Sequence, residues 1–168
     1  MLTGELMRKL LQAMQKNARQ LLELSKEQET LSDKTSTLSE NSPDFPQVAG
    51  EQEKTRSALN RVIQSMIESA RQSLQVSPRI NESLGQADQQ MQNALKEMEQ
   101  RNASPAAQHQ ENAMAALNSA VQGIQSMMQN MMQQGGQGGM SMQSFMQQMQ
   151  KMADAQQQIN QNTPSLSS

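Results

Sequence analysis

An unbroken alternation of three- and four-residue spacings runs through residues 5–38 and limits the fold more than any other feature. This pattern is the heptad register of a helix that packs along one seam, and seven of its ten seam positions are apolar. A helix of about 50 Å, at about 1.5 Å per residue, is not stable alone in water. We therefore expect other helices to cover it. The seam consists of Met7, Leu10, Met14, Asn17, Leu21, Leu24, Gln28, Leu31, Thr35 and Leu38.

The composition favours helices over sheets. Apolar residues make up 35% of the 168 residues, and Phe45 and Phe145 are the only aromatic residues. A thick globular core normally relies on large rings, whereas here Leu, Met and Ala must do the packing. The most abundant residues are helix formers, and strand-forming residues are scarce. The composition therefore predicts an all-α protein with thin helix–helix seams.

Proline and serine mark the expected ends of four helices. Pro43 and Pro46 lie in a segment rich in turn residues, and we expect them to exclude helix from residues 39–50. Ser77-Pro78 and Ser104-Pro105 are each typical of an N-cap followed by the first helical position. Because the later connections are short, neighbouring helices should be antiparallel. We predict an elongated antiparallel bundle, or coiled-coil hairpins, over residues 1–134, with helices at about 4–40, 50–76, 78–102 and 105–133.

A methionine-rich segment follows the predicted bundle. Nine methionines lie between Met127 and Met152, and a glycine-rich sequence at residues 135–139 divides them. We expect these glycines to form a hinge, residues 140–160 to form a fifth helix, and residues 161–168 to form a disordered tail.

Charge and cysteine content exclude several classes of protein. The net charge is −2 and the basic residues are scattered, so no stripe is suited to nucleic acid. Cysteine is absent, which excludes disulfides and thiolate metal sites. No stretch approaches the roughly 20 apolar residues that a membrane span needs. We expect no cofactor.

The only histidine does not indicate catalysis. His109 lies in a polar segment at the start of the fourth predicted helix, and Glu111 is its only close acidic neighbour in the sequence. A catalytic histidine needs an orienting partner and a nucleophile, so a solvated side chain is the better interpretation. The glycines at 135–139 lack the Lys-Ser/Thr of a phosphate-binding loop. We therefore expect a protein that is not an enzyme.

The methionines allow three interpretations. Thioethers suit Cu(I), so the cluster is a candidate copper site. Methionine also adapts its shape to apolar partners, so residues 124–152 could form a hinged, chaperone-like clamp for apolar helices. The third interpretation is a seam within the chain or between copies. The candidate partner-binding residues are Leu21, Leu24, Leu31, Leu38, Met127, Met128, Met131, Met142, Phe145, Met146, Met149 and Met152.

Three polar residues interrupt the first seam: Asn17, Gln28 and Thr35. Polar groups at seam positions destabilise a bundle unless they are paired, but they can fix its register or oligomeric state. The alternative is that the helix is only partly covered and these residues meet water. The first helix is also about ten residues longer than its expected neighbours, which predicts that part of its seam remains open.

Three parts of the chain carry a resemblance to known proteins. They are Leu21 to Ser25 with Gln28 and Glu29, Glu99 to Asn118, and Ser141 to Thr163 with the preceding MMQNMMQQGGQGGM. These segments resemble a bacterial domain-of-unknown-function family of large membrane-anchored proteins with long helical regions. The resemblance implies that this chain is a fragment of the helical C-terminal region, without catalytic residues, tethered to a membrane through a region outside it.

These observations together predict a non-catalytic interaction or scaffolding module. Its apolar stripes would recruit another helical protein or a second copy of the chain, giving a homo-oligomer. The chaperone-like clamp and the copper site are the alternative functions.

Overall fold

The structure, a computed structural model, describes residues 4–73 and 78–135. These residues form four helices and no strand: α1 (Gly4–Ser36), α2 (Phe45–Ser73), α3 (Pro78–Glu99) and α4 (Ala103–Gly135). The predicted all-α bundle is confirmed. The predicted fifth helix at 140–160 and the tail lie outside the described residues, as does the predicted hinge apart from Gly135, which ends α4.

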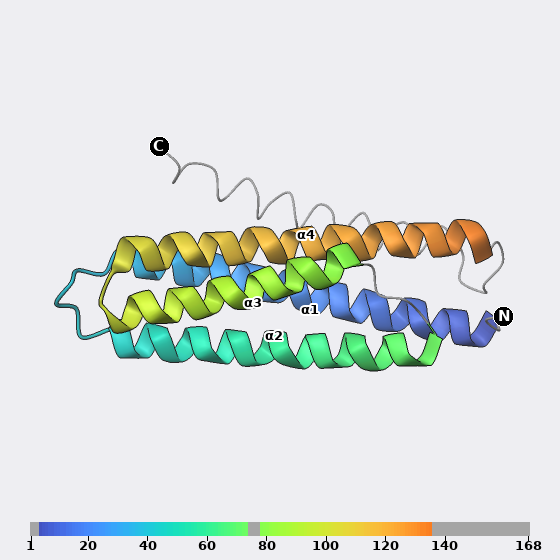
Figure 1. Ribbon diagram of the computed structural model, residues 1–168, viewed down its shortest axis with the longest axis horizontal. Coiled ribbons are helices and arrows are strands. Elements are labelled where there is room, and N and C mark those ends of the chain that lie inside the picture. Colours follow the sequence, from blue (N-terminus) through green and yellow to red (C-terminus); the bar gives the residue numbers. More distant parts are fainter. Residues whose placement is uncertain (1–3, 74–77, 136–168) are drawn as a thin grey trace.

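The four helices form an elongated antiparallel bundle (Figure 1). Each helix packs against two others, so that α1 and α3 both lie between α2 and α4. The connections 37–44 and 100–102 lie at the same end of the bundle. Contact is most extensive where α4 meets α1 and α3, and it is smaller where α2 meets the same two helices.

The prediction for the start of α2 is wrong. The helix begins at Phe45 instead of about residue 50, so Pro46 occupies its second position. Proline is tolerated there because the first four N–H groups of a helix have no partner within it. The Val48 N–H donates to the Asp44 carbonyl at 3.0 Å, and the Asp44 N–H donates to Ser42 Oγ at 3.2 Å. These bonds order the chain just before the helix.

The expected ends of three other helices also shift. Helix α1 ends at Ser36 instead of about 40, where the Thr37 and Leu38 N–H groups bond three residues back and tighten the last turn. Helix α3 ends at Glu99, and α4 begins at Ala103 instead of 105. The Ala106 N–H donates to the Asn102 carbonyl, so Asn102 is the cap in place of the expected Ser104. Pro78 begins α3 as expected.

Arg101 closes the α3–α4 turn in a left-handed conformation, with φ 60°. The Asn102 N–H donates to the Glu97 carbonyl at 2.8 Å, and the Arg101 N–H donates to Met98 at 3.0 Å. This is a Schellman motif, in which glycine usually holds the left-handed position. The Arg101 guanidinium donates to the Ser42 carbonyl at 2.9 Å and lies 5.7 Å from the centre of the Phe45 ring. The arginine thus joins the two connections at this end.

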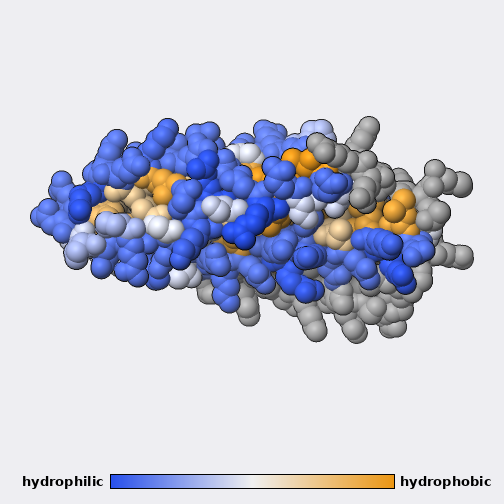
Figure 2. Space-filling model, turned by 90° about the horizontal axis from the view of Figure 1, so that it is seen from below, coloured by the Kyte–Doolittle hydropathy of each residue, from blue (hydrophilic) through white to orange (hydrophobic). Residues whose placement is uncertain are grey.

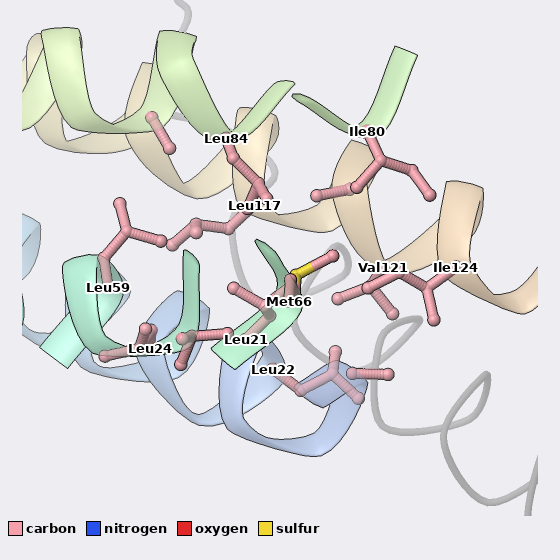
Figure 3. Close-up of a cluster of buried hydrophobic side chains, with 14 of the residues drawn as sticks. Leu21, Leu22, Leu24, Leu59, Met66, Ile80, Leu84, Leu117, Val121 and Ile124 are labelled. Atoms are coloured by element: carbon pink, nitrogen blue, oxygen red, sulfur yellow. The ribbon is translucent and has the colours of Figure 1, made fainter. Parts of the chain in front are cut away.

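Within residues 4–73 and 78–135, the core consists of two apolar clusters along the bundle. The larger cluster takes residues from all four helices, and Figure 3 shows its centre. The smaller cluster lies toward the end where α1 ends and α2 begins. Its buried members are Leu31, Phe45, Val48, Ala94, Met98 and Ala106.

The expectation that the first helix has an open seam is wrong. Helices α1 and α4 both contain 33 residues, and α1 packs extensively against α4. Asn17, Gln28 and Thr35 are all buried, at 3%, 0% and 0% exposure, so the interpretation that they meet water is also wrong. The seam positions at the two ends, Met7 and Leu38, are half-buried. The reason is that α1 ends earlier than the sequence predicted, while α4 starts earlier and ends later, so the two helices have the same length.

Candidate interaction site

The structure places the predicted partner-binding leucines inside the chain's own core. Leu21, Leu24 and Leu31 are at most 5% exposed. Leu38, just after α1, is half-buried against the smaller cluster. Because these side chains already pack within one chain, a partner can reach most of them only if a helix moves away.

The predicted methionines divide between described and undescribed parts of the chain. On α4, Met128 and Met131 are buried in the larger cluster, and Met127 is half-buried against it. Their thioethers therefore pack among apolar side chains. The remaining candidates lie outside the described residues: Met142, Phe145, Met146, Met149 and Met152.

His109 pairs with an amide and not with an acid. Its Nδ1 lies 2.7 Å from Oε1 of Gln90 on α3, and the side chain is half-buried. In residues 4–73 and 78–135, no group of three His, Asp or Glu residues is placed to hold a metal ion. The pair thus contributes to the α3–α4 contact.

Helix α2 differs from α1 and α4 in how it is buried. Over residues 45–69 it buries one narrow row, with spacings that alternate strictly between three and four. Helix α1 buries a second row beside its heptad seam, for example Leu11, Ala18 and Leu22. A single row removes less apolar surface from water per turn, so hydrophobic burial holds α2 less strongly. The row consists of Phe45, Val48, Gln52, Thr55, Leu59, Val62 and Met66.

A layer of three buried glutamines separates the two apolar clusters. Gln28 of α1 and Gln52 of α2 exchange hydrogen bonds through their side-chain amides, with Gln28 Nε2 donating to Gln52 Oε1 at 3.1 Å. Gln110 Nε2 of α4 donates to the same Gln52 oxygen at 3.0 Å. All three side chains are fully buried. Gln110 Oε1 accepts no hydrogen bond from the described part of the chain, so the layer is not fully satisfied.

Ionic and polar contacts fix α2 on both sides. Arg56 Nε lies 3.0 Å from Asp88 Oδ1 of α3, and Lys34 Nζ of α1 lies 3.3 Å from Glu51 Oε2. The Arg56–Asp88 pair is the less exposed of the two, at 27% and 24% side-chain exposure. These pairs set the position of α2 along α1 and α3 more than they stabilise it, because partly exposed pairs contribute little energy.

A groove of about 580 Å³ runs between α1 and α2. Glu23, Lys26 and Lys54 line it and form no ion pair within the described residues. Figure 2 views the molecule from the α2 side and shows a mostly hydrophilic surface with separate apolar patches. The groove is lined by Glu23, Lys26, Glu27, Thr30, Leu31, Glu51, Lys54 and Thr55.

Glu29 is the titratable group of α1 with an altered pKa. Partial burial raises the pKa of Glu29 above its ordinary 4.5, the negative charge of Asp33 raises it further, and Lys26 partly opposes both effects. The shift follows from ordinary packing and charge repulsion along α1.

Comparison with known proteins assigns no family. No family model matches this sequence, and neither the curated proteins nor the solved structures give a significant match. The resemblance to a membrane-anchored bacterial family therefore stays a prediction. Among the described residues, no helix has a stretch apolar and long enough to cross a membrane.

The seam pattern of the sequence predicts only Gln28 among the three glutamines of the buried layer. It does not predict Gln52 or Gln110, although Gln52 lies seven residues before Leu59 in the register of α2. If α2 is taken to begin at Phe45, the alternation of three- and four-residue spacings predicts that Gln52 and Thr55 are buried. Gln110 carries no such signal, because α4 buries more than one row and contains many other glutamines from which the sequence does not distinguish it.

Proposed function

We propose that this chain is a non-catalytic helical interaction or scaffolding module that recruits another protein through the α1–α2 side of the bundle. The observation that carries the proposal is the groove beside α2, because α2 contacts α1 and α3 less extensively than α4 does. Glu23, Lys26 and Lys54 line this groove with charges of both signs, and they form no ion pair within residues 4–73 and 78–135. Charges of both signs suit a partner helix that carries the complementary charge pattern.

Site-specific photo-crosslinking tests this proposal. A benzophenone amino acid replaces Lys26 in the groove, or Asn112 on the exposed face of α4 as a matched control, in cells that naturally produce the chain. We expect a discrete adduct from position 26 and not from position 112, identified by mass spectrometry. The same adducts from both positions, or none from position 26, would contradict the proposal.

Light scattering coupled to size exclusion then identifies the kind of partner. If the partner is a second copy, the mass of the full chain rises from one chain to two as concentration increases. If the partner is another protein, the purified pair elutes with the sum of both masses. A charge reversal at Lys26 should weaken either assembly, because the lysine lies in the groove and forms no ion pair with the part of the chain that the structure describes.

A further inference from the structure

The apolar seam under α2 is a surface that the movement of a single helix would uncover. Leu59 and Met66 of α2 point into the cluster that contains Leu21 of α1, Leu84 of α3 and Leu117 of α4 (Figure 3). The α1–α4 and α3–α4 contacts are the two most extensive in the bundle, and neither involves α2. Three helices would therefore retain their main contacts if α2 left.

Separating α2 from the other helices should cost less free energy than separating a helix whose buried row is entirely apolar. Two of the seven positions in the buried row of α2, Gln52 and Thr55, are polar. When α2 leaves, the amides of Gln52, Gln28 and Gln110 regain hydrogen bonds with water, whereas exposed leucines regain nothing. The unmet acceptor Gln110 Oε1 also gains a partner from water. Local opening of the most weakly packed element is expected on these grounds.

The contacts of α2 define the chemistry of any helix that could replace it. A replacement needs an amide side chain to meet Gln28 and Gln110, and an acidic residue directly before it to meet Lys34. It needs a basic residue four positions after the amide to meet Asp88. Apolar residues must follow at the spacing of α2's own row, which ends in Leu59, Val62 and Met66.

We propose that α2 is an exchangeable helix, and that the partner inserts an amphipathic helix with this pattern into the place of α2 on α1, α3 and α4. This inference rests on the proposed function and names its partner: a helix with an acid–amide pair, a basic residue four positions after the amide, and three apolar residues beyond. Burial of Leu21, Leu24 and Leu31 then protects the binding seam until the partner arrives. The apparent affinity for the partner equals its intrinsic affinity multiplied by the fraction of chains with α2 open.

A peptide with the sequence of residues 45–73 is the probe, because its pattern meets every requirement. It is labelled with fluorescein, and its anisotropy is measured with the full-length chain. In the chain, Gln52→Ala leaves Gln28 and Gln110 unpaired under α2, so we expect about tenfold tighter peptide binding, the factor that corresponds to about 1.4 kcal/mol. In the peptide, the same change should weaken binding about tenfold. Gln64→Ala, at an exposed position of α2, is the matched control and should change neither value.

Hydrogen exchange shows whether the peptide displaces α2. Bound peptide should speed amide exchange in residues 45–69 of the chain and leave α4 protected. Peptide binding without faster exchange in α2 would overturn the proposal, as would no binding to either the wild-type or the Gln52→Ala chain. If Gln52→Ala unfolds the chain, judged by circular dichroism, Arg56→Ala replaces it, with a smaller gain of about threefold because its ion pair is partly exposed.

The two proposals fail separately. A crosslink from position 26 together with no peptide binding would mean that the partner docks in the groove while α2 stays in place. In that case the interaction module stands and the exchange of α2 is rejected. Peptide exchange without any crosslink would mean that the seam opens but no natural partner uses it.

Discussion

Helices α2 and α4 occupy opposite corners of the same bundle and solve the packing problem differently. Both contact α1 and α3, but α4 buries more than one row and is rich in small residues such as Ala113, Ala120 and Gly123. Small residues let helix backbones approach closely, so many weak contacts add up. Helix α2 buries one row and places Gln52 at a central contact. The comparison teaches that one bundle can combine three helices with extensive mutual contacts through α4 and a fourth helix held by fewer contacts.

The largest expected effect contrasts two fully buried leucines. Leu117 of α4 and Leu59 of α2 are both 0% exposed. We expect Leu117→Ala to lower the free energy of unfolding by about 4 kcal/mol, because α4 is fixed on two sides and the cavity cannot collapse. Leu59→Ala should cost about 2–3 kcal/mol, because α2 can shift to fill part of the space. Urea denaturation measures both, and an equal or larger cost at Leu59 would break the comparison.

Two glycines offer a sharper test of packing distance. A Cβ atom on Gly123 of α4 would lie 2.8 Å from Cγ1 of Ile80, whereas a Cβ on Gly50 of α2 would meet nothing within 4 Å. We expect Gly50→Ala to stabilise the chain by about 0.5–1 kcal/mol through its better helix propensity. Gly123→Ala should destabilise it by about 1 kcal/mol, because overpacking outweighs that gain. Thermal melts followed by circular dichroism measure the difference, and equal stabilisation by both would contradict close α3–α4 packing.

Arg101 tests how the two halves are joined at one end. Arg101→Ala keeps the left-handed φ but loses the contacts with Ser42 and Phe45, so we expect a loss of about 1–2 kcal/mol. Arg101→Gly loses the same contacts but relieves the backbone strain, so its loss should be smaller by about 1 kcal/mol. Denaturation midpoints compare the two. A glycine variant that is no more stable than the alanine variant would show that φ is not strained there.

The smallest expected effect concerns Glu29 of α1, the helix that contacts both α2 and α4. Because the pKa of Glu29 is raised in the folded chain, the fold binds a proton at this site more tightly than the unfolded chain does. The ionised Glu29 side chain therefore destabilises the folded chain at neutral pH. This destabilisation is lost as the pH falls toward and below the ordinary pKa of 4.5. We expect Glu29→Gln to be slightly more stable than the wild type at pH 7 and no more stable at pH 4. Urea midpoints at both values test the sign.

The four helices followed from the sequence, but their exact ends did not. Pro46 predicts a break in the helix, although it lies in the first turn of α2, where the missing N–H group of proline has no cost. Arg101 in a position that favours glycine gave no local signal for the end of α3. Its side chain reaches the connection between α1 and α2, and that contact exists only in the folded bundle. Helix ends thus depend partly on neighbours that a local pattern does not contain.

The sequence by itself determined that this protein is built from helices and that α1 carries a continuous seam, because spacing and composition act locally along the chain. It also marked Gln28 as an unusual seam residue. Only the tertiary structure decided that Gln28 meets Gln52 and Gln110, that the candidate leucines are covered, and that α2 covers them with a single row. The physical reason is that burial and amide pairing depend on which faces meet across helices, and three-dimensional packing alone sets that.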